Sequence, residues 1–160
     1  MRRKQHKMTM TNYLISTNKE LLQIEAVHTY LSIESYWAKG IPLKTVQTSI
    51  DNSLCWGIYC NQQQIGFARV ISDHATFAYL ADVYILEPHR GKGLSKQLMT
   101  EIFKHPNLQK IRRWMLLTLD AHHIYRPFGF VAPAFPERIM EISLVNPYKS
   151  LEHSTEVKGD

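Results

Sequence analysis

Long apolar stretches are missing from this chain of 160 residues. No run of eighteen apolar residues occurs, so the sequence predicts no membrane-spanning helix and no membrane partner. The basic N-terminus lacks the apolar segment that a secretory signal carries, and we therefore expect a cytoplasmic protein. The motif Gly-Lys-Ser/Thr is also missing, which excludes a nucleotide-hydrolysing P-loop.

Cysteine is scarce, with Cys55 and Cys60 only, and both fall in a predicted strand, Leu54–Cys60. Five strand residues span roughly 16 Å, and their odd spacing places the two thiols on opposite faces. A disulfide between them is excluded on geometry, so we expect two reduced, buried thiols. No pairing of cysteine and histidine with metal-site spacing occurs, and no metal is predicted.

Positive charge is concentrated at the N-terminus. Of the formal net charge of +5, four charges come from Arg2, Arg3, Lys4 and Lys7, which leaves the middle of the chain nearly neutral. We therefore expect no nucleic-acid partner, although a basic arm that binds nucleic acid stays open as an alternative. Residues 1–11 and 149–160 are polar and aperiodic, which predicts disordered arms around a single domain at residues 12–148.

Hydrophobic periodicity alternates between the strand and the helix type along that domain. Strands are predicted at Tyr13–Ser16, Leu54–Cys60, Gln64–Ser72, Thr76–Leu86, Trp114–Leu119 and Met140–Leu144. Helices are predicted from Asn18 to Leu31 and at Leu43–Asp51, Gly93–Phe103 and His122–Phe128. Three consecutive strands followed by strand–helix–strand units predict a mixed α/β fold, with helices packed on a mixed sheet.

The turn between the strand that ends near Leu86 and the helix that begins near Gly93 carries the strongest functional signal. Gly91 and Gly93 allow a ligand to approach the backbone closely. The helix that follows offers unpaired N–H groups and the positive end of its dipole. This order predicts an anion site suited to a diphosphate.

Residues 90–95, Arg-Gly-Lys-Gly-Leu-Ser, are similar to the Q/R-x-x-G-x-G/A signature of GNAT acyltransferases, with Ser95 at the last position. Residues 121–130 resemble the family's A-x-x-x-Y-x-x-x-G-F segment, with Tyr125 at the tyrosine. The resemblance implies a mostly antiparallel mixed sheet of about six to seven strands with about four helices. It also implies acetyl-CoA as co-substrate and direct transfer of the acetyl group to an amine in a ternary complex. The resemblance implies that the amine belongs to a small molecule or a peptide. It leaves open whether the protein forms a homodimer.

The resemblance also implies roles for individual residues. In relatives a bulge splays one strand, here Val83, Tyr84 and Ile85, so that its N–H groups face the thioester carbonyl. Tyr125 contacts the cofactor and protonates the leaving thiolate, because a phenol is protonated at neutral pH. The phosphates are held by Arg90, Gly91, Lys92, Gly93, Leu94 and Ser95.

The family motifs do not identify the general base or the acceptor pocket. Asp82 and Asp120 are candidate bases, together with His122 and His123. In the competing interpretation, Asp82 pairs with Arg69 and Asp120 caps the short helix. The acceptor pocket is expected at Tyr36, Trp37 and Lys39, which precede a chain break at Gly40-Ile41-Pro42. A catalytically silent acyl-CoA sensor is the alternative function, which thioester consumption with a panel of amines would exclude.

Overall fold

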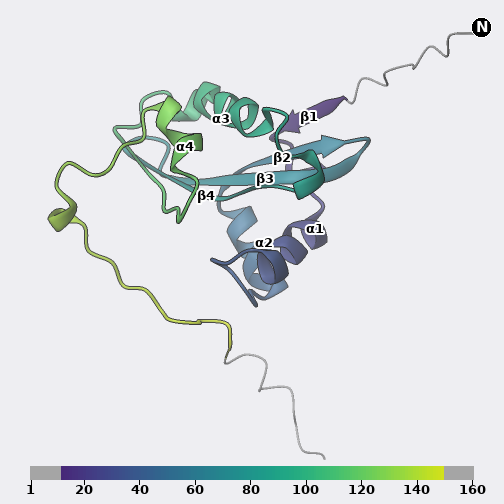
Figure 1. Cartoon of the computed structure of the whole chain (residues 1–160), viewed down its shortest axis with the longest axis horizontal. Coiled ribbons are helices and arrows are strands. Elements are labelled where there is room, and N and C mark those ends of the chain that lie inside the picture. The colour runs from purple at the N-terminus through teal and green to yellow at the C-terminus, as the bar shows by residue number, and fades with distance from the viewer. Residues whose placement is uncertain (1–11, 150–160) are drawn as a thin grey trace, which may run out of the picture.

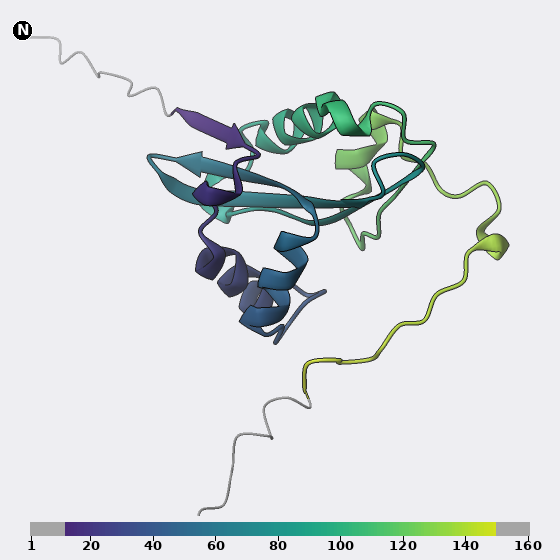
Figure 2. The ribbon, with the colours of Figure 1, turned by 180° about the vertical axis from the view of Figure 1, so that it is seen from behind.

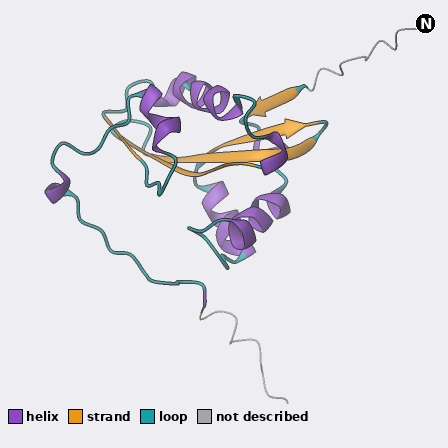
Figure 3. Cartoon of the chain, in the orientation of Figure 1, coloured by secondary structure: helices purple, strands orange, loops and turns teal. Residues whose placement is uncertain are grey.

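The computed structural model describes residues 12–149, which fold around one five-stranded sheet in the order β1-β2-β3-β4-β5 (Figures 1 and 3). Strands β1 to β4 pair antiparallel in sequence order, whereas β5 runs parallel to β4. This arrangement confirms the mixed sheet expected from the sequence. The strands are β1 (Tyr13–Ser16), β2 (Leu54–Cys60), β3 (Gln63–Ser72), β4 (Phe77–Ile85) and β5 (Arg113–Met115).

Helices cover both faces of the sheet. The helices are α1 (Ile24–Thr29), α2 (Leu43–Asp51), α3 (Leu94–Lys104) and α4 (His122–Tyr125). Helices α1 and α2 lie on one face, while α3 and α4 lie on the other (Figures 1 and 2). Two hydrophobic cores result, one between the sheet and α3–α4 and one between the sheet and α1–α2. Because both faces are covered, the residues of β2 are buried from Cys55 to Cys60.

Helix α3 follows directly from its sequence pattern. Leu94, Leu98, Met99 and Ile102 recur at helical spacing, and all four are buried against the sheet. The helix begins after Gly93, and Pro106 follows its end. This placement points the N-terminus of α3 at the turn that carries the two glycines.

A β-bulge interrupts β4. Phe67 of β3 pairs with Tyr84, whereas Arg69 pairs with Ala81, so two residues of β4 face one residue of β3. Asp82 takes the left-handed backbone conformation there, with φ of +53°. Aspartate adopts this region more readily than most residues do. The bulge turns β4 immediately before Val83–Ile85, where the resemblance implies one.

Strands β4 and β5 separate soon after they pair. Their ladder joins Phe77–Tyr79 to Arg113–Met115 only. Within residues 12–149, the remainder of β4, including Val83–Ile85, therefore has no strand partner on the β5 side. A wedge-shaped opening between two neighbouring strands exposes backbone N–H groups that a continuous sheet would use.

Several predicted boundaries are wrong, and the sheet has fewer strands than expected. The strand predicted at Met140–Leu144 is wrong, because these residues have no regular secondary structure and pair with no strand within the described residues. The strand predicted at Trp114–Leu119 is shorter than expected. Only Arg113–Met115 pairs with β4, because β4 turns away at its bulge. The disordered arms predicted at 1–11 and 149–160 lie outside the described residues, apart from Lys149.

The helix predicted from Asn18 to Leu31 is divided. A 3₁₀ turn at Lys19–Leu21 is separated from α1, and a π-helical turn at Tyr30–Glu34 follows α1. Gln23 explains the break, because its N–H donates to the side chain of Gln64 at 2.7 Å, and its own side chain accepts from the N–H of Gln64 at 3.1 Å. This contact with β3 replaces the hydrogen bonds of a continuous helix.

We expect the protein to lose stability as the pH rises from about 9 to 12. Burial raises the pKa of Cys55 from 9.0 to about 11, and it raises the pKa of Tyr59 from 10.0 to about 12. The folded protein therefore keeps protons that the unfolded chain has already released. Each such group lowers the free energy of unfolding by about 1.4 kcal/mol per pH unit between its two pKa values. Thermal melting followed by circular dichroism across this range measures the effect.

Tyr59→Phe is the matched control for this alkaline effect. The Tyr59 hydroxyl is buried without a hydrogen-bond partner within the described residues, so its removal costs no hydrogen bond. We expect a melting temperature at pH 8 equal to or above that of the wild type, and a shallower decline above pH 10. A wild-type melting temperature that stays constant up to pH 11 would contradict the assignment of buried, protonated groups.

Candidate active site

The turn before α3 forms an open cradle. Gly91 and Gly93 have φ of +73° and +75°, a region that favours glycine. A Cβ placed on either residue would meet no atom within 4 Å, so both positions face open space. Helix α3 also begins without a side-chain cap, which leaves the N–H groups of its first turn, at Leu94 and Ser95, for a ligand. These features together fit an anionic group held by backbone.

Two basic side chains flank the cradle. Arg90 is held by the strand end, because its Nε donates to the carbonyl of Ile85 at 2.8 Å and its Nη2 to the hydroxyl of Tyr30 at 3.4 Å. Lys92 turns to the opposite side, where its Nζ donates to the hydroxyl of Tyr13 at 3.1 Å. Both cations therefore lie close to the glycine turn and add positive charge beside the N-terminus of α3.

Asp82 sits at the bulge and is held on both sides. One carboxylate oxygen accepts from Nε of Arg69, and the other accepts from Nε1 of Trp37 at 2.9 Å. The side chain of Asp82 is only 10% exposed. The competing interpretation, a partnership between Asp82 and Arg69, is therefore present in the structure. Trp37 is an additional partner that comes from the predicted acceptor loop.

The loop after α1 spans the opening between β4 and β5. Trp37 contacts β4 through Asp82, and the hydroxyl of Tyr36 accepts from the N–H of Leu119 at 3.1 Å, in the segment after β5. Lys39 is exposed on the same loop. The structure thus brings the predicted acceptor residues to the place where the two strands part.

An aromatic series connects this loop to β4. Tyr84 stacks on Tyr30 with ring centroids 3.7 Å apart, Tyr30 lies 6.4 Å from Trp37, and Trp37 meets Tyr36 edge-on at 5.0 Å. Tyr30 and Tyr84 are buried, whereas Tyr36 and Trp37 are 58% and 42% exposed. The inner pair supports the loop, and the outer pair faces solvent where a ligand could contact it.

Tyr125 lies on the other side of the opening, in α4. It is buried, and its ring meets that of Phe130 edge-on at 6.0 Å. Burial, with a smaller contribution from the nearby phenol of Tyr36, raises the pKa of Tyr125 to about 12. The phenol therefore carries its proton throughout the neutral pH range. A phenol in this state is able to donate a proton at any physiological pH.

Asp120, His122 and His123 are exposed at the start of α4. The interpretation of Asp120 as the helix cap is wrong, because Ala121 occupies the cap position without a side-chain cap. The N–H of Ala121 instead donates to Oγ1 of Thr118 at 3.0 Å. Asp120 is therefore free of a capping role, and no hydrogen bond ties its side chain to the rest of residues 12–149.

Sequence reasoning missed some neighbours of the cradle. Tyr13 of β1 accepts from Lys92, and its hydroxyl also lies 3.0 Å from Nδ1 of His89. Tyr13 is 76 positions from His89 and 79 from Lys92, and no local pattern indicates that they meet.

In residues 12–149 no group of three potential metal ligands occurs, and no helix there is long and apolar enough to cross a bilayer.

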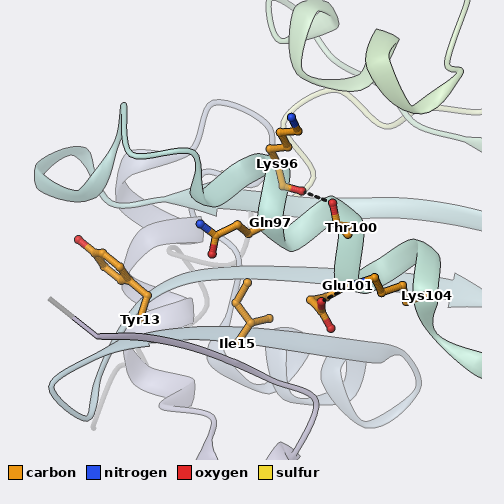
Figure 4. Close-up of a pocket in the computed structure, with 7 residues that line it drawn as sticks. All are labelled: Tyr13, Ile15, Lys96, Gln97, Thr100, Glu101 and Lys104. Atoms are coloured by element: carbon orange, nitrogen blue, oxygen red, sulfur yellow. Dashed lines mark hydrogen bonds and ion pairs between the residues drawn. The ribbon is translucent and has the colours of Figure 1, made fainter. Parts of the chain in front are cut away.

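A separate hollow of about 480 Å³ lies between β1 and α3 (Figure 4). Most of its lining side chains belong to α3, and they carry charges of both signs. It contains none of the predicted site residues, so we place the candidate active site at the opening between β4 and β5. The lining residues are Tyr13, Ile15, Lys96, Gln97, Thr100, Glu101 and Lys104.

Known proteins share this sequence and this architecture. The model of the family described as acetyltransferase (GNAT) domain matches residues 51–132. A Gibberella zeae protein named as an acetyltransferase is 32% identical over 139 residues, which are 73% of this chain and 77% of that protein.

Two solved structures extend the comparison. A crystal structure from Xanthomonas campestris pv. campestris, described as an acetyltransferase of the GNAT family, is 48% identical with a TM-score of 0.85. It covers 88% of this chain and 99% of its own, so the alignment reaches beyond residue 130. An acetyltransferase from Clostridium acetobutylicum, solved with acetyl-CoA, shares the fold at 18% identity and a TM-score of 0.60, over 91% of this chain and 99% of its own.

The family match and the geometry agree with each other. The matched residues 51–132 contain the glycine cradle, the bulged strand and Tyr125, which the structure gathers around one opening in the sheet. The match covers half of the chain, and the relative from Gibberella zeae supports it over a longer stretch. This chain therefore belongs to the GNAT family of acetyltransferases.

Proposed function

We propose that this protein transfers the acetyl group of acetyl-CoA directly to an amine of a small molecule or peptide in a ternary complex. The observation that carries the proposal is the meeting of three features at one opening. An uncapped helix N-terminus with two left-handed glycines lies beside a bulged strand, and a buried tyrosine lies across from it. When bound, acetyl-CoA supplies an activated acyl group and a thiolate leaving group.

The cradle is suited to hold the diphosphate. The backbone N–H groups from Gly91 to Ser95 bind its oxygens, and the open space beside both glycines leaves room for close approach. Arg90 and Lys92 add positive charge from fixed positions on either side. Serine at position 95 keeps this surface small and adds a hydroxyl donor.

The splayed part of β4 is suited to orient the acyl carbonyl. Val83, Tyr84 and Ile85 have no strand partner on the β5 side within the described residues, so their N–H groups on that side can donate to a ligand. A preorganised donor of this kind stabilises the negative charge that develops on a carbonyl oxygen during acyl transfer. The bulge at Asp82 aims the strand toward the opening.

Residues on the two sides of the opening between β4 and β5 are suited to transfer protons. Tyr125 donates its phenolic proton to the leaving thiolate. Asp82 and Asp120 remain the candidates for accepting the proton of the amine, directly or through water. Asp82 is held by Trp37 and Arg69, so its carboxylate is fixed in direction, whereas Asp120 is exposed.

Release of the free thiol from acetyl-CoA in the presence of a panel of primary amines tests the proposed function. We expect thiol release that depends on the amine, together with an acetylated product of matching mass. Binding of acetyl-CoA without amine-dependent release for any amine or peptide of the panel would favour the silent sensor instead.

The acceptor pocket is expected to respond to Trp37. Trp37→Ala removes the exposed ring and its hydrogen bond to Asp82, so we expect a higher KM for the acceptor and a nearly unchanged KM for acetyl-CoA. Trp37→Phe is the matched variant, because it keeps a six-membered aromatic ring while it removes the pyrrole ring with its N–H donor. Steady-state kinetics with each substrate varied in turn measures both constants. An equal loss for both substrates would assign Trp37 to packing.

A further inference from the structure

Tyr13, at the start of β1, contacts two residues of the glycine turn from a distant part of the chain. Its hydroxyl lies 3.0 Å from Nδ1 of His89 and 3.1 Å from Nζ of Lys92. The Tyr13 ring also meets the His89 ring edge-on, with centroids 5.7 Å apart, and Nζ of Lys92 lies 5.8 Å from the centroid of the Tyr13 ring. Tyr13 therefore holds each of the two residues through both its hydroxyl and its ring.

His89 and Lys92 stand on either side of Gly91, where the turn has the most backbone freedom. Gly91 has φ of +73°, and glycine is the residue with the widest choice of backbone conformations. Before the glycine, the turn is closed by the N–H of His89, which donates to the carbonyl of Leu86 at 2.9 Å. Tyr13 links that closed part to Lys92 across Gly91. Such a link restricts the turn before any ligand arrives, which lowers the entropy lost on binding.

Tyr13 is anchored in the sheet, so it is able to fix the turn. It pairs with Cys60 in the ladder between β1 and β2, and its ring packs against the core on the α3 side of the sheet. In the hollow between β1 and α3, Tyr13 lies at the end that is away from Lys104 (Figure 4). The hydroxyl thus reaches the glycine turn from a strand of the sheet and not from a second loop.

The donors and acceptors around the Tyr13 hydroxyl indicate the direction of its hydrogen bonds. An ammonium has N–H donors and no acceptor, so Lys92 donates to the Tyr13 oxygen. The proton of the Tyr13 hydroxyl is then available to Nδ1 of a neutral His89, which accepts it when the ring proton is on Nε2. If Nδ1 carried the proton instead, the hydroxyl proton would have neither of these two partners. The bonds therefore run from Lys92 to Tyr13 to His89.

We propose that Tyr13 is a positioning residue of the cradle, which accepts from Lys92, donates to His89 and so holds the Lys92 ammonium ready for a phosphate. The inference rests on the proposed function, because it requires a diphosphate in the cradle. Tyr13 uses one of the three N–H donors of the ammonium, and within residues 12–149 no other hydrogen bond to that ammonium occurs. The remaining donors are available to phosphate oxygens.

Calorimetric titration with acetyl-CoA tests the proposal through Tyr13→Phe, which keeps the ring that packs on the core and deletes the hydroxyl. We expect the affinity for acetyl-CoA to fall by about fivefold or more, in the range of one lost hydrogen bond. Tyr59→Phe is the matched control, because it deletes a buried hydroxyl that has no hydrogen-bond partner within the described residues. We expect this control to bind acetyl-CoA as the wild type does.

A double-mutant cycle with Lys92→Met separates positioning of the ammonium from packing of the ring. Lys92→Met keeps a long side chain and removes the charge. Because Tyr13 acts through Lys92, Tyr13→Phe should weaken acetyl-CoA binding by less than about twofold in the Lys92→Met background. Equal losses in both backgrounds, or tighter binding by Tyr13→Phe, would overturn the proposal. Unchanged affinity in Tyr13→Phe overturns the role of Tyr13 alone, whereas a wild type that binds no acetyl-CoA overturns the proposed function as well.

Nitrogen NMR of the histidine rings tests the direction of the hydrogen bonds without any cofactor. Spectra at about pH 8 observe neutral imidazoles, and His89→Gln identifies the signals of His89 by their loss. We expect a His89 ring that is protonated at Nε2, with an Nδ1 resonance that moves in Tyr13→Phe and not in Tyr59→Phe. A ring protonated at Nδ1, or an Nδ1 resonance that Tyr13→Phe leaves in place, contradicts the proposed arrangement.

Discussion

Replacing Tyr125 by phenylalanine is expected to lower the turnover number by about 10²-fold, while the affinity for acetyl-CoA stays nearly unchanged. The substitution keeps the ring that packs against Phe130 and deletes only the hydroxyl. Without that hydroxyl the thiolate must leave without a proton from the enzyme. Steady-state kinetics and calorimetric titration with acetyl-CoA measure the two effects.

Tyr36→Phe provides the comparison for this loss. It removes a second phenol, one that accepts from the N–H of Leu119, so we expect its main effect on the KM of the acceptor. Since the pKa of Tyr125 is about 12, the wild-type rate should show no decline from its ionisation below about pH 11. Wild-type turnover in Tyr125→Phe would assign Tyr125 to the core alone.

Replacing Gly93 by valine is expected to weaken acetyl-CoA binding by tenfold or more, about 1.4 kcal/mol. The new side chain would occupy the open space beside the cradle, where no atom of the protein lies within 4 Å of a Cβ. It would also strain the backbone, because φ is +75° at this position and a β-branched residue tolerates that region poorly. Isothermal titration calorimetry on the folded variant measures the loss.

Two asparagine variants separate the effect of a side chain in the cradle from the effect of backbone strain. Asparagine tolerates the left-handed region, so Gly93→Asn keeps the backbone and adds only a side chain in the cradle. Gly129 has φ of +94° and equally open surroundings outside the cradle, so Gly129→Asn is its matched control. We expect reduced affinity in the first variant and nearly normal affinity in the second. Unchanged affinity in a folded Gly93→Asn would remove the cradle from the binding site.

Local sequence was sufficient where local physics determines the structure. Strands β1 and β2 and helix α2 have the predicted bounds, because alternation and helical spacing are set by neighbouring residues. The cradle was predictable for the same reason. Positive φ at Gly91 and Gly93 and the apolar stripe of the helix that follows both depend on residues that are close together in the sequence.

The partners of Asp82 show where this reasoning ends. The sequence placed Asp82 directly before the strand segment Val83–Ile85. As the alternative to a role as general base, it predicted an ion pair with Arg69 on the neighbouring strand. Trp37 lies 45 residues away, and only the packing of the loop after α1 brings its N–H to the carboxylate. The same holds for the bulge, because an aspartate at φ of +53° has no sequence signature.

By itself, the sequence determined the order of the elements, the cradle and the family resemblance, because each depends on short-range periodicity or on glycine conformation. The tertiary structure alone decided how the elements meet. It ended β5 at Met115, set Tyr36 against Leu119 across 83 residues, and left Met140–Leu144 without a strand partner in the described chain. A strand needs a neighbour, and whether an edge is free depends on distant segments that local propensity does not describe.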